Sequence, residues 1–514
     1  MTTALVPPMV PERDVSTETS WRAARRAVVL TLVVAVPVVF DTTVRPAFAL
    51  PKFTVVALGA VLLIALTLVE RALWRTDSLS ANGLKVPVLL LVAWTAVAAG
   101  ASGDPGTSVF GDRESFNGLA TSLGLVALFF AAADAFDGAR VRTALGVLWF
   151  GAGGAVLLYA AVQLRDHVAG GRHWDPIRWL NAPDDWATWS TLGNPNDLAG
   201  FLAILLPIGL VLLALAPTRR MRGATAAMVL LLVTVMSATG SRGALLGAVA
   251  GVGALAFWFR RTIRQRAALA LVLGGAVVGV AVAVSAAAVV VAKEPGPRRA
   301  GDVLAVSEET TTDLRVELWK TAWRMAEDNP LLGVGPDRFG RSFDDYRSKR
   351  FVRLYGPDLL ATDPHNVYFS YLATQGFPGF AAFCFLVVAA VALFRRTTRS
   401  LGWQSALTAA SSPTEQQALA GAIAAALIAY LVQGSLNRHD IALEFCWWLL
   451  LGLLCALGGC RLQPARRGRS RATSATTTPA APTASATQEI VLPPSSPSPD
   501  PSPAETRTMS LHHS

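Results

Sequence analysis

The chain has 514 residues, of which 53% are hydrophobic and 16% are charged, with a net charge of +10 and a mean hydropathy of +0.44. This composition excludes an ordinary soluble protein and indicates a membrane protein. The basic residues flank apolar runs, as they do in membrane proteins generally, so the positive charge gives no reason to expect nucleic acid as a partner.

Apolar runs of about 20 residues recur from Ala27 to Gly459, and each is long enough to cross a hydrocarbon core of about 30 Å as a helix. The sequence therefore predicts an all-α, polytopic membrane protein with about twelve transmembrane helices. The predicted spans are 27–44, 53–70, 84–101, 117–136, 141–163, 197–216, 223–239, 243–259, 267–291, 365–394, 417–434 and 441–459.

Arginine and lysine concentrate in alternate loops, for example at 219–222, 260–266 and 395–399. Because cytoplasmic loops are enriched in these residues, the pattern predicts a multi-pass protein of the cytoplasmic (inner) membrane with both termini inside the cell. We expect three parts: a cytoplasmic segment at 1–26, a polytopic domain at 27–460, and a tail at 461–514. The tail is rich in Ala, Ser, Thr and Pro, so it is expected to be disordered.

Two of the predicted outer loops are long, at 163–196 and 293–363, and a structureless loop of such length is uncommon unless it is functional. Part of the second loop, "TTDLRVELWKTAWRMAEDNP", has a helical pattern that begins at Thr312 or Asp313 and ends before Asn329-Pro330.

Helical spacing within this segment separates two arginines. Arg315 shares a face with Leu318 and Ala322, whereas Arg324 falls on a charged face that we expect to be solvated. An arginine on an apolar face needs a partner. Arg315 could pair with a carboxylate, reach the membrane interface, or bind an anionic ligand.

Arg242 lies in "SATGSRGALLG", where two apolar spans are joined by a very short outer turn. Gly240 and Gly243 permit such a turn. An outer arginine works against the positive-inside pattern, so an anionic ligand is favoured over a purely topological role.

Asn194 and Asn196 precede another span in "STLGNPNDLAG". Asparagine before an apolar helix is typical of ordinary capping, but these amides could also bind sugar hydroxyls at the outer surface.

His365 follows Asp363-Pro364 at the expected start of the 365–394 span. A helix N-terminus disfavours positive charge, so the imidazole should stay neutral and could accept a proton. The alternative is a hydrogen-bonded structural histidine. Gly376 and Gly379 on the same helix offer small faces for close packing.

Several motifs resemble, in order, those of the O-antigen ligase and polymerase-like membrane glycosyltransferases. "HNVYFSYLATQGFPG" resembles the family's His-Asn pattern followed by Gly-x-x-Gly, and "RVELWKTAWRMAEDNPLLGVGPDRF" resembles the segment before it. "TLGNPNDLAG" and "TGSRGALL" resemble two further landmarks, and "VFGDRESFNGL" weakly resembles another. The residues concerned are Arg113, Asn194, Asn196, Arg242, Arg315, His365, Asn366, Gly376 and Gly379.

The resemblance implies an inverting transfer on the outer face of the cytoplasmic membrane. The donor would be a glycan linked through pyrophosphate to a polyprenyl lipid, and the acceptor a sugar hydroxyl on a glycan, lipid or protein. Arg242 and Arg315 would stabilise the pyrophosphate and His365 would accept or orient the hydroxyl proton. The substrate-binding candidates are Asn194, Asn196, Arg113 and Asn366.

No His, Cys and carboxylate set has metal-ligand spacing, and "GVGPDRFG" lacks the Lys-Ser/Thr of a P-loop, so neither a metal nor another cofactor is expected. The main alternative is a polysaccharide or lipid-linked glycan transporter (flippase), which would favour broken helices near the midplane and an internal repeat. A non-catalytic scaffold is a third reading. Ligase and polymerase are not separated by the sequence.

Overall fold

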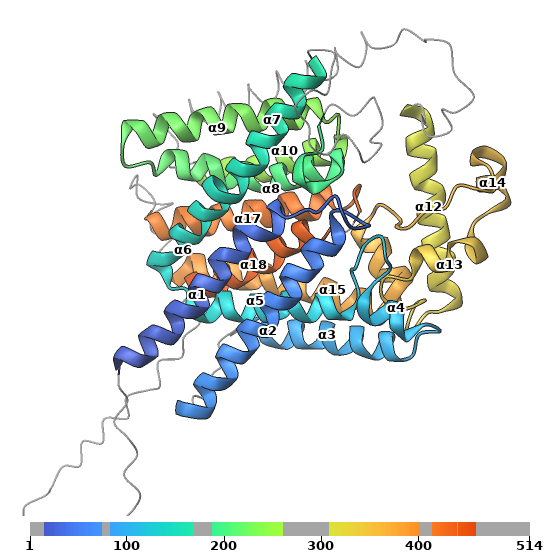
Figure 1. Cartoon of the computed structure of the whole chain (residues 1–514), viewed down its shortest axis with the longest axis horizontal. Coiled ribbons are helices and arrows are strands. Elements are labelled where there is room, and N and C mark those ends of the chain that lie inside the picture. The colour runs from blue at the N-terminus through green and yellow to red at the C-terminus, as the bar shows by residue number, and fades with distance from the viewer. Residues whose placement is uncertain are drawn as a thin grey trace, which may run out of the picture. The chain divides into compact units, whose positions relative to one another are not determined.

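The computed structural model of the chain describes residues 15–74, 83–168, 188–260, 308–400, 414–438 and 440–458. The regular secondary structure in these ranges is entirely helical, so the predicted all-α class is confirmed for them (Figure 1). The expected tail at 461–514 and the predicted span at 267–291 lie outside the described residues.

The apolar runs form the helices of a membrane bundle, and every predicted span other than 267–291 falls on one of them. These helices are α1 (Val15–Val38), α2 (Ala49–Trp74), α3 (Lys85–Gly100), α5 (Leu119–Ala135), α6 (Gly138–Gly146), the π-helical η1 (Val147–Gly153), α7 (Gly154–Val168), α8 (Pro195–Ala214), α9 (Arg219–Ala238), α10 (Arg242–Phe259), α15 (Val367–Ser400), α17 (Glu415–Gln433) and α18 (Ile441–Leu457). The other elements are α4 (Pro105–Phe110), the 3-10 turn η3 (Ser190–Leu192), α12 (Glu308–Asp328), α13 (Phe339–Tyr346) and α14 (Lys349–Tyr355).

Seven helical segments among the described residues are long and apolar enough to cross a membrane, which makes the chain an integral membrane protein. Three shorter apolar helices, Lys85–Gly100, Leu119–Ala135 and Ile441–Leu457, accompany them. The count of about twelve spans stays a prediction. The first helix begins at Val15 and so includes residues that precede the predicted 27–44 span, while the predicted cytoplasmic segment at 1–26 stays a prediction.

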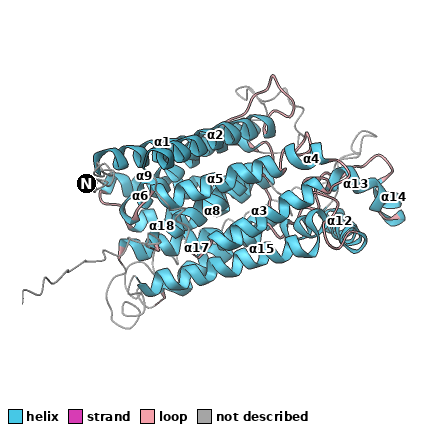
Figure 2. Ribbon diagram, turned by 90° about the horizontal axis from the view of Figure 1, so that it is seen from below, coloured by secondary structure: helices cyan, strands magenta, loops and turns pink. Residues whose placement is uncertain are grey.

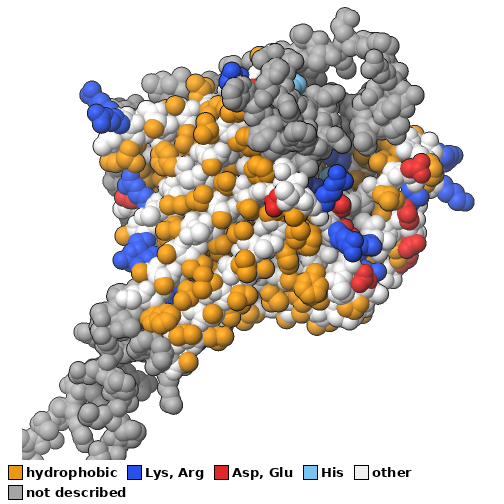
Figure 3. Space-filling view, viewed as in Figure 1, with side chains coloured by type: hydrophobic (Ala, Val, Ile, Leu, Met, Phe, Trp, Pro, Cys, Tyr) orange, Lys and Arg blue, Asp and Glu red, His pale blue; other side chains and the backbone are white. Residues whose placement is uncertain are grey.

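The helices differ in how much of their surface the bundle covers. Most side chains of α8 and α17 are buried, and the two helices pack against each other. In contrast, α2 exposes Leu58 and Val61, at 66% and 67% of their surface. Figure 3 shows hydrophobic side chains across the visible face of the bundle and charged ones mainly toward its ends. These exposed apolar faces are suited to lipid contact.

Buried ion pairs tie together one end of the bundle, which we call the arginine-rich end. Arg25 is 3% exposed and pairs with Glu70 at 2.5 Å and with Asp134 at 2.7 Å, joining α1, α2 and α5. Arg142 donates to the Leu215 carbonyl at 2.9 Å and pairs with Glu415 at 3.2 Å. The residues that meet here come from helix ends that the charge pattern assigns to one side of the membrane.

At the opposite end, residues 308–363 form a structure that we call the cap, and α12, α13 and α14 lie together there (Figures 1 and 2). The cap has its own apolar core, formed by Leu318, Ala322, Met325, Val334, Phe339, Phe343 and Phe351 together with Ala373 of α15. The expected helix is α12. It ends at Asp328 as predicted, but it begins at Glu308, before the expected capping residues.

Part of the charged face of α12 is covered, although Lys320, Glu327 and Asp328 on that face are exposed. Glu317 is only 3% exposed and accepts a hydrogen bond from the Ser348 hydroxyl at 2.7 Å. Arg324 is half-buried and donates to the Tyr346 carbonyl at 3.0 Å. The expectation for Arg324 was wrong because α13 and α14 fold back onto this face, which helical spacing alone cannot reveal.

The cap is joined to the bundle at a break in α15. Gly376 has φ 68° and ψ −173°, a conformation outside the helical region. The backbone groups released there bond the loop that follows α12: Phe377 N–H donates to the Pro330 carbonyl at 2.9 Å, while Val334 and Gly335 N–H groups donate to the Ala373 and Thr374 carbonyls at 2.9 and 3.0 Å. Non-helical backbone is thereby satisfied inside the protein, as membrane proteins require.

Helix α3 supports the same break from the other side. The Trp94 indole donates to the Gln375 carbonyl at 2.9 Å, and the Thr95 hydroxyl donates to the Gln375 side-chain oxygen at 2.9 Å. From Gly376 to Arg395 the helix rises about 28 Å at 1.5 Å per residue, close to one hydrocarbon thickness of about 30 Å. If the exposed Arg395 marks one membrane boundary, as the charge pattern predicts, the break lies near the other boundary and not at the midplane, where a transporter would favour a broken helix.

We expect Gly376→Ala to lower the thermal stability of the detergent-solubilised protein. A Cβ there would lie 2.4 Å from the Leu331 carbonyl oxygen, and the backbone conformation is strained for any residue with a Cβ, at a cost of about 1–3 kcal/mol before the clash is counted. Gly253→Ala in α10 is the matched control, because no heavy atom lies within 4 Å of its added Cβ. Equal melting temperatures for Gly376→Ala and wild type would contradict this account of the junction.

Candidate functional site

Arg242 is the first residue of α10 and is exposed at the cap end of the bundle. Helix α9 ends at Ala238, and Gly240, with φ 67°, forms the short turn that the sequence predicted. The side chain consequently projects from a helix start, where the peptide dipoles also favour an anion.

Arg315 lies on α12, which packs against α15 of the bundle. Trp319, one turn further along α12, stacks on Phe369 of α15 with ring centroids 5.7 Å apart, and Leu318 is 1% exposed. The Arg315 side chain is half-buried, and this burial lowers its pKa; the charge of Arg242 lowers the pKa further. The cap therefore brings two residues, 73 positions apart in the chain, close enough for their positive charges to repel each other.

His365 precedes α15 in an unusual backbone conformation, with φ 52°. Its N–H donates to the Asp363 carboxylate at 2.6 Å, and its Nδ1 lies 4.0 Å from the same oxygen, beyond hydrogen-bond distance. The helix begins at Val367, two residues after the start of the predicted 365–394 span, because the Asn366 side chain caps it. The imidazole keeps 43% of its surface exposed, so it remains accessible to a substrate.

The pKa of His365 is lowered from its usual 6.5, as expected, but not by the helix dipole on which the prediction relied. Loss of hydration among the surrounding atoms is the largest cause, and the charges of Arg438 and Arg315 add to it. The Asp363 carboxylate opposes the shift. The imidazole is therefore held in its neutral form near pH 7 and has a nitrogen that can accept a proton.

Arg438, which sequence reasoning missed, belongs to the same cluster. It follows α17 in the short connection to α18 and forms two hydrogen bonds with Asp197 Oδ2, at 3.0 Å from Nε and 2.7 Å from Nη2. Asp197 is fully buried in the first turn of α8, and its charge is the main cause of the raised pKa of Arg438. A signal was present, because Arg438 lies in a short predicted outer loop, as Arg242 does.

Lys52 was also missed, although it immediately precedes the predicted 53–70 span, which itself contains no Lys or Arg. Its side chain is 0% exposed, and Nζ donates to the Thr191 carbonyl at 2.8 Å and lies 5.3 Å from the centre of the Phe48 ring. This bond joins the start of α2 to η3, the turn that precedes α8.

The predicted substrate-binding asparagines have structural partners. Asn194 caps α8, accepting from the Asn196 N–H at 2.8 Å, while both side chains remain partly exposed. Asn366 is 6% exposed: its Oδ1 accepts from the Tyr368 and Phe369 N–H groups, and its Nδ2 donates to the Ser435 carbonyl at 2.8 Å. The structure thus gives Asn366 a role in positioning His365. Arg113 is exposed in the loop before α5.

A cavity of about 160 Å³ adjoins this cluster and is walled by the ends of segments far apart in the sequence. Its lining includes Pro46, Phe48, Glu114, Ser115, Asn117, Gly193, Asp337, Thr362, Asp363, Arg438 and Asp440. Carboxylates and amides of this kind are acceptors and donors suited to hydroxyl groups. The loop that contains Arg113 contributes three of these lining residues.

Asp337 connects the cap to this cavity wall. Its carboxylate accepts from the Asp112 and Asn117 N–H groups at 2.7 and 2.9 Å and from the Ser115 hydroxyl at 2.7 Å. Burial raises the pKa of Asp337 to about 7, although these hydrogen bonds oppose the shift. The loop at 111–118 is thereby held against the cap and closes one side of the cavity.

Within the described ranges, no group of three His, Cys, Asp or Glu side chains is placed to hold a metal ion. The cations of the site, Arg242, Arg315 and Arg438, are its strongest chemical feature, and together with neutral His365 they are suited to an anionic ligand beside a group that loses a proton.

These features define a multi-helix membrane protein with a cationic site beneath a helical cap. Residues 226–384 match the family described as O-antigen ligase, which supports membership of an O-antigen ligase-like family and confirms the resemblance drawn from the motifs. The matched segment contains Arg242, Arg315 and His365. No curated protein sequence matches the chain. The family acts on lipid-linked glycans in polysaccharide biosynthesis.

We expect Asp197→Asn to destabilise the protein by about 3 kcal/mol, because it leaves the Arg438 guanidinium without its buried partner. The double variant Asp197→Asn/Arg438→Gln should lose less than the sum of the two single losses, as measured by chemical or thermal unfolding in one detergent. Glu415→Gln is the control, because its pair with Arg142 is exposed and worth about 0–1 kcal/mol. Strictly additive losses at Asp197 and Arg438 would show that the two side chains are not coupled.

Proposed function

We propose that this protein is a glycosyltransferase that moves a polyprenyl-pyrophosphate-linked glycan to a sugar hydroxyl on the outer face of the cytoplasmic membrane. The observation that supports this most strongly is the approach of Arg242 and Arg315, from separate parts of the chain, to a site that also holds a neutral histidine. Like charges repel, so such an arrangement is favoured when an anion is bound between them.

The pyrophosphate of the donor fits this pair of cations. As the glycosidic bond breaks, negative charge grows on the leaving pyrophosphate oxygen, and guanidinium groups bind such oxygens through charge-assisted hydrogen bonds. Because Arg315 is half-buried, its interaction with that charge is less screened by water than an exposed pair would be. Arg242 and Arg315 would therefore stabilise the transition state more than the bound donor.

His365 is the proposed base. The acceptor oxygen forms a bond to the anomeric carbon as the bond from that carbon to the pyrophosphate oxygen breaks, and the bonding electron pair leaves with the pyrophosphate. The hydroxyl proton passes to the neutral His365 ring. Attack from the side opposite the leaving group inverts the anomeric centre. In this scheme the arginines take the part that a metal ion plays in other transferases, so the proposed step is metal-independent.

The cavity beside Arg438 is the proposed binding site for sugar rings. Asn194 and Asn196 flank it at the start of α8, and Arg113 lies in the loop that lines it. Their partly exposed polar groups can bond to hydroxyls of the donor or acceptor glycan. The acceptor is a glycan, lipid or protein, and ligation and polymerisation use the same chemistry at this site.

The proposed orientation places the cap outside the cell and both termini in the cytoplasm. Its support is the charge asymmetry, since the arginine-rich end has the basic clusters that cytoplasmic loops typically contain. A transporter or flippase is the alternative function. The position of the α15 break near a membrane boundary gives no support to a midplane transport site.

For the catalytic residues, we expect His365→Gln to reduce glycan transfer about 10²- to 10⁴-fold, because the base is lost. Arg315→Gln and Arg242→Gln should each reduce the turnover about 10²-fold through weaker stabilisation of the pyrophosphate charge. The assay would use purified, reconstituted protein with a lipid-linked glycan donor and candidate acceptors, following both products and chain lengths.

Arg353→Gln is the control for these variants, because Arg353 is an exposed arginine of α14 in the same cap. It should retain full transfer. Each variant must match wild type in its melting temperature before rates are compared. Full transfer by His365→Gln would remove the base assignment, and donor translocation without transfer by the wild-type protein would favour the flippase.

The electrostatic effect of Arg438 on His365 also predicts how the transfer rate depends on pH. If neutral His365 is the base, kcat/KM should fall as the pH drops through the lowered pKa of His365, below its usual 6.5, and should level off above it. Arg438→Gln removes a cation that repels the imidazolium, so the acidic limb should move to higher pH in this variant. Arg353→Gln should leave the limb in place. An acidic limb that is identical in wild type and Arg438→Gln would contradict the coupling.

A further inference from the structure

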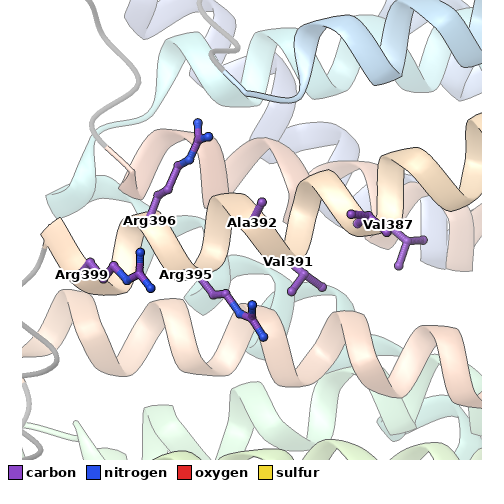
Figure 4. Close-up of a pocket in the computed structure, with 7 residues that line it drawn as sticks. Val387, Val391, Ala392, Arg395, Arg396 and Arg399 are labelled. Carbon is purple, nitrogen blue, oxygen red and sulfur yellow. The ribbon is translucent and has the colours of Figure 1, made fainter.

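The last turns of α15, at the arginine-rich end, combine an apolar groove with a cluster of cations (Figure 4). The groove has a volume of about 390 Å³, within the range of about 300–1,000 Å³ typical of small-ligand sites. It is lined by Val387, Val388, Val391, Ala392, Arg395, Arg396 and Arg399. None of these residues belongs to the candidate site at the cap.

Helical spacing arranges the lining into a row. Val387, Val391, Arg395 and Arg399 follow one another at intervals of four, so they lie along one stripe of α15. Figure 4 shows Val391 and Arg395 on the same side of the ribbon. The row thus changes from apolar to cationic along the helix axis, toward the arginine-rich end. Such a gradient matches a lipid, whose acyl chain and charged headgroup are separated in the same way.

The surroundings of the cations support the same conclusion. Val388 and Val391 are 64% and 48% exposed, and the side chains of Arg395, Arg396 and Arg399 are exposed as well. The structure shows no ion pair between these three arginines and a carboxylate among the described residues. Three guanidinium groups next to exposed valines attract a headgroup phosphate, and they favour a lipid of net negative charge over a zwitterionic one, whose ammonium group they would repel.

We propose that this groove binds an anionic phospholipid of the surrounding membrane. One acyl chain lies along Val387, Val388 and Val391, and the headgroup phosphate is held by Arg395 and Arg399. The proposal does not depend on the transfer reaction at the cap end.

Native mass spectrometry of the full-length protein, with phosphatidylglycerol or phosphatidylcholine added in a lipid-free detergent, would test this. We expect wild type to retain phosphatidylglycerol in preference to phosphatidylcholine. Arg395→Gln/Arg399→Gln should bind phosphatidylglycerol about tenfold more weakly. The control is Arg219→Gln/Arg220→Gln, which removes the same charge from exposed residues at the start of α9, at the same end of the bundle. It should change retention less than about twofold, because Arg219 and Arg220 do not line the groove.

A second pair of variants tests the apolar half of the groove. Val391→Trp fills the path of the acyl chain while keeping every arginine, and it should also weaken retention. Leu230→Trp places the same ring on α9 at a residue that is 58% exposed, and it should not. The proposal would be overturned if the two double-arginine variants lost phosphatidylglycerol equally, or if Val391→Trp retained it as wild type does. Displacement of the lipid by millimolar inorganic phosphate would overturn it as well. The last result would indicate a free-phosphate site.

Discussion

The break in α15 at Gly376 is the constraint on which the rest of the site depends. It allows the loop after α12 to bond directly to the backbone of a membrane helix, through Pro330, Val334 and Gly335. The nine residues of α15 before the break lie between the cap and the rest of the bundle. Arg315 lies on the helix that precedes this junction, and His365 on the segment that leads into it. One backbone irregularity thus fixes the relative positions of two candidate catalytic side chains.

Charge is distributed unevenly around this junction. Asp197 neutralises Arg438 at the cap end of the bundle, and the Lys52 ammonium is hydrogen-bonded to a main-chain carbonyl. The pKa of Arg315 is lowered, first by burial and then by the positive charge of Arg242. Pairing Arg438 firmly with a buried acid keeps it in place as a source of positive potential beside His365. The histidine is consequently kept neutral by its surroundings, which is the protonation state that a base requires.

The sequence predicted the helices well, because a membrane span must be a continuous apolar run that satisfies its own backbone. It also proposed Arg242, Arg315 and His365 as site residues, because Arg242 and His365 lie where apolar helices begin and Arg315 lies on an apolar helical face. It missed Arg438 and Lys52, because their partners, Asp197 and the Thr191 carbonyl, are distant in the chain. It misjudged Arg324, since the packing of α13 and α14 on α12 leaves no periodic signal in α12 itself. Contacts between segments far apart in sequence are what local patterns cannot supply.

The distance along α15 from the break at Gly376 to the terminal arginines is close to the thickness of a membrane. The break at Gly376 and the arginines that begin at Arg395 are separated by about 28 Å of helix, close to one hydrocarbon layer. A cationic row at one boundary resists movement of the helix along the membrane normal, because burying a guanidinium in hydrocarbon costs several kcal/mol. The depth of the break, and with it the height of His365 and Arg315 above the lipid, is therefore set from the opposite surface. The proposed transfer would need this register, since the pyrophosphate of a polyprenyl-linked donor would be confined to the headgroup layer.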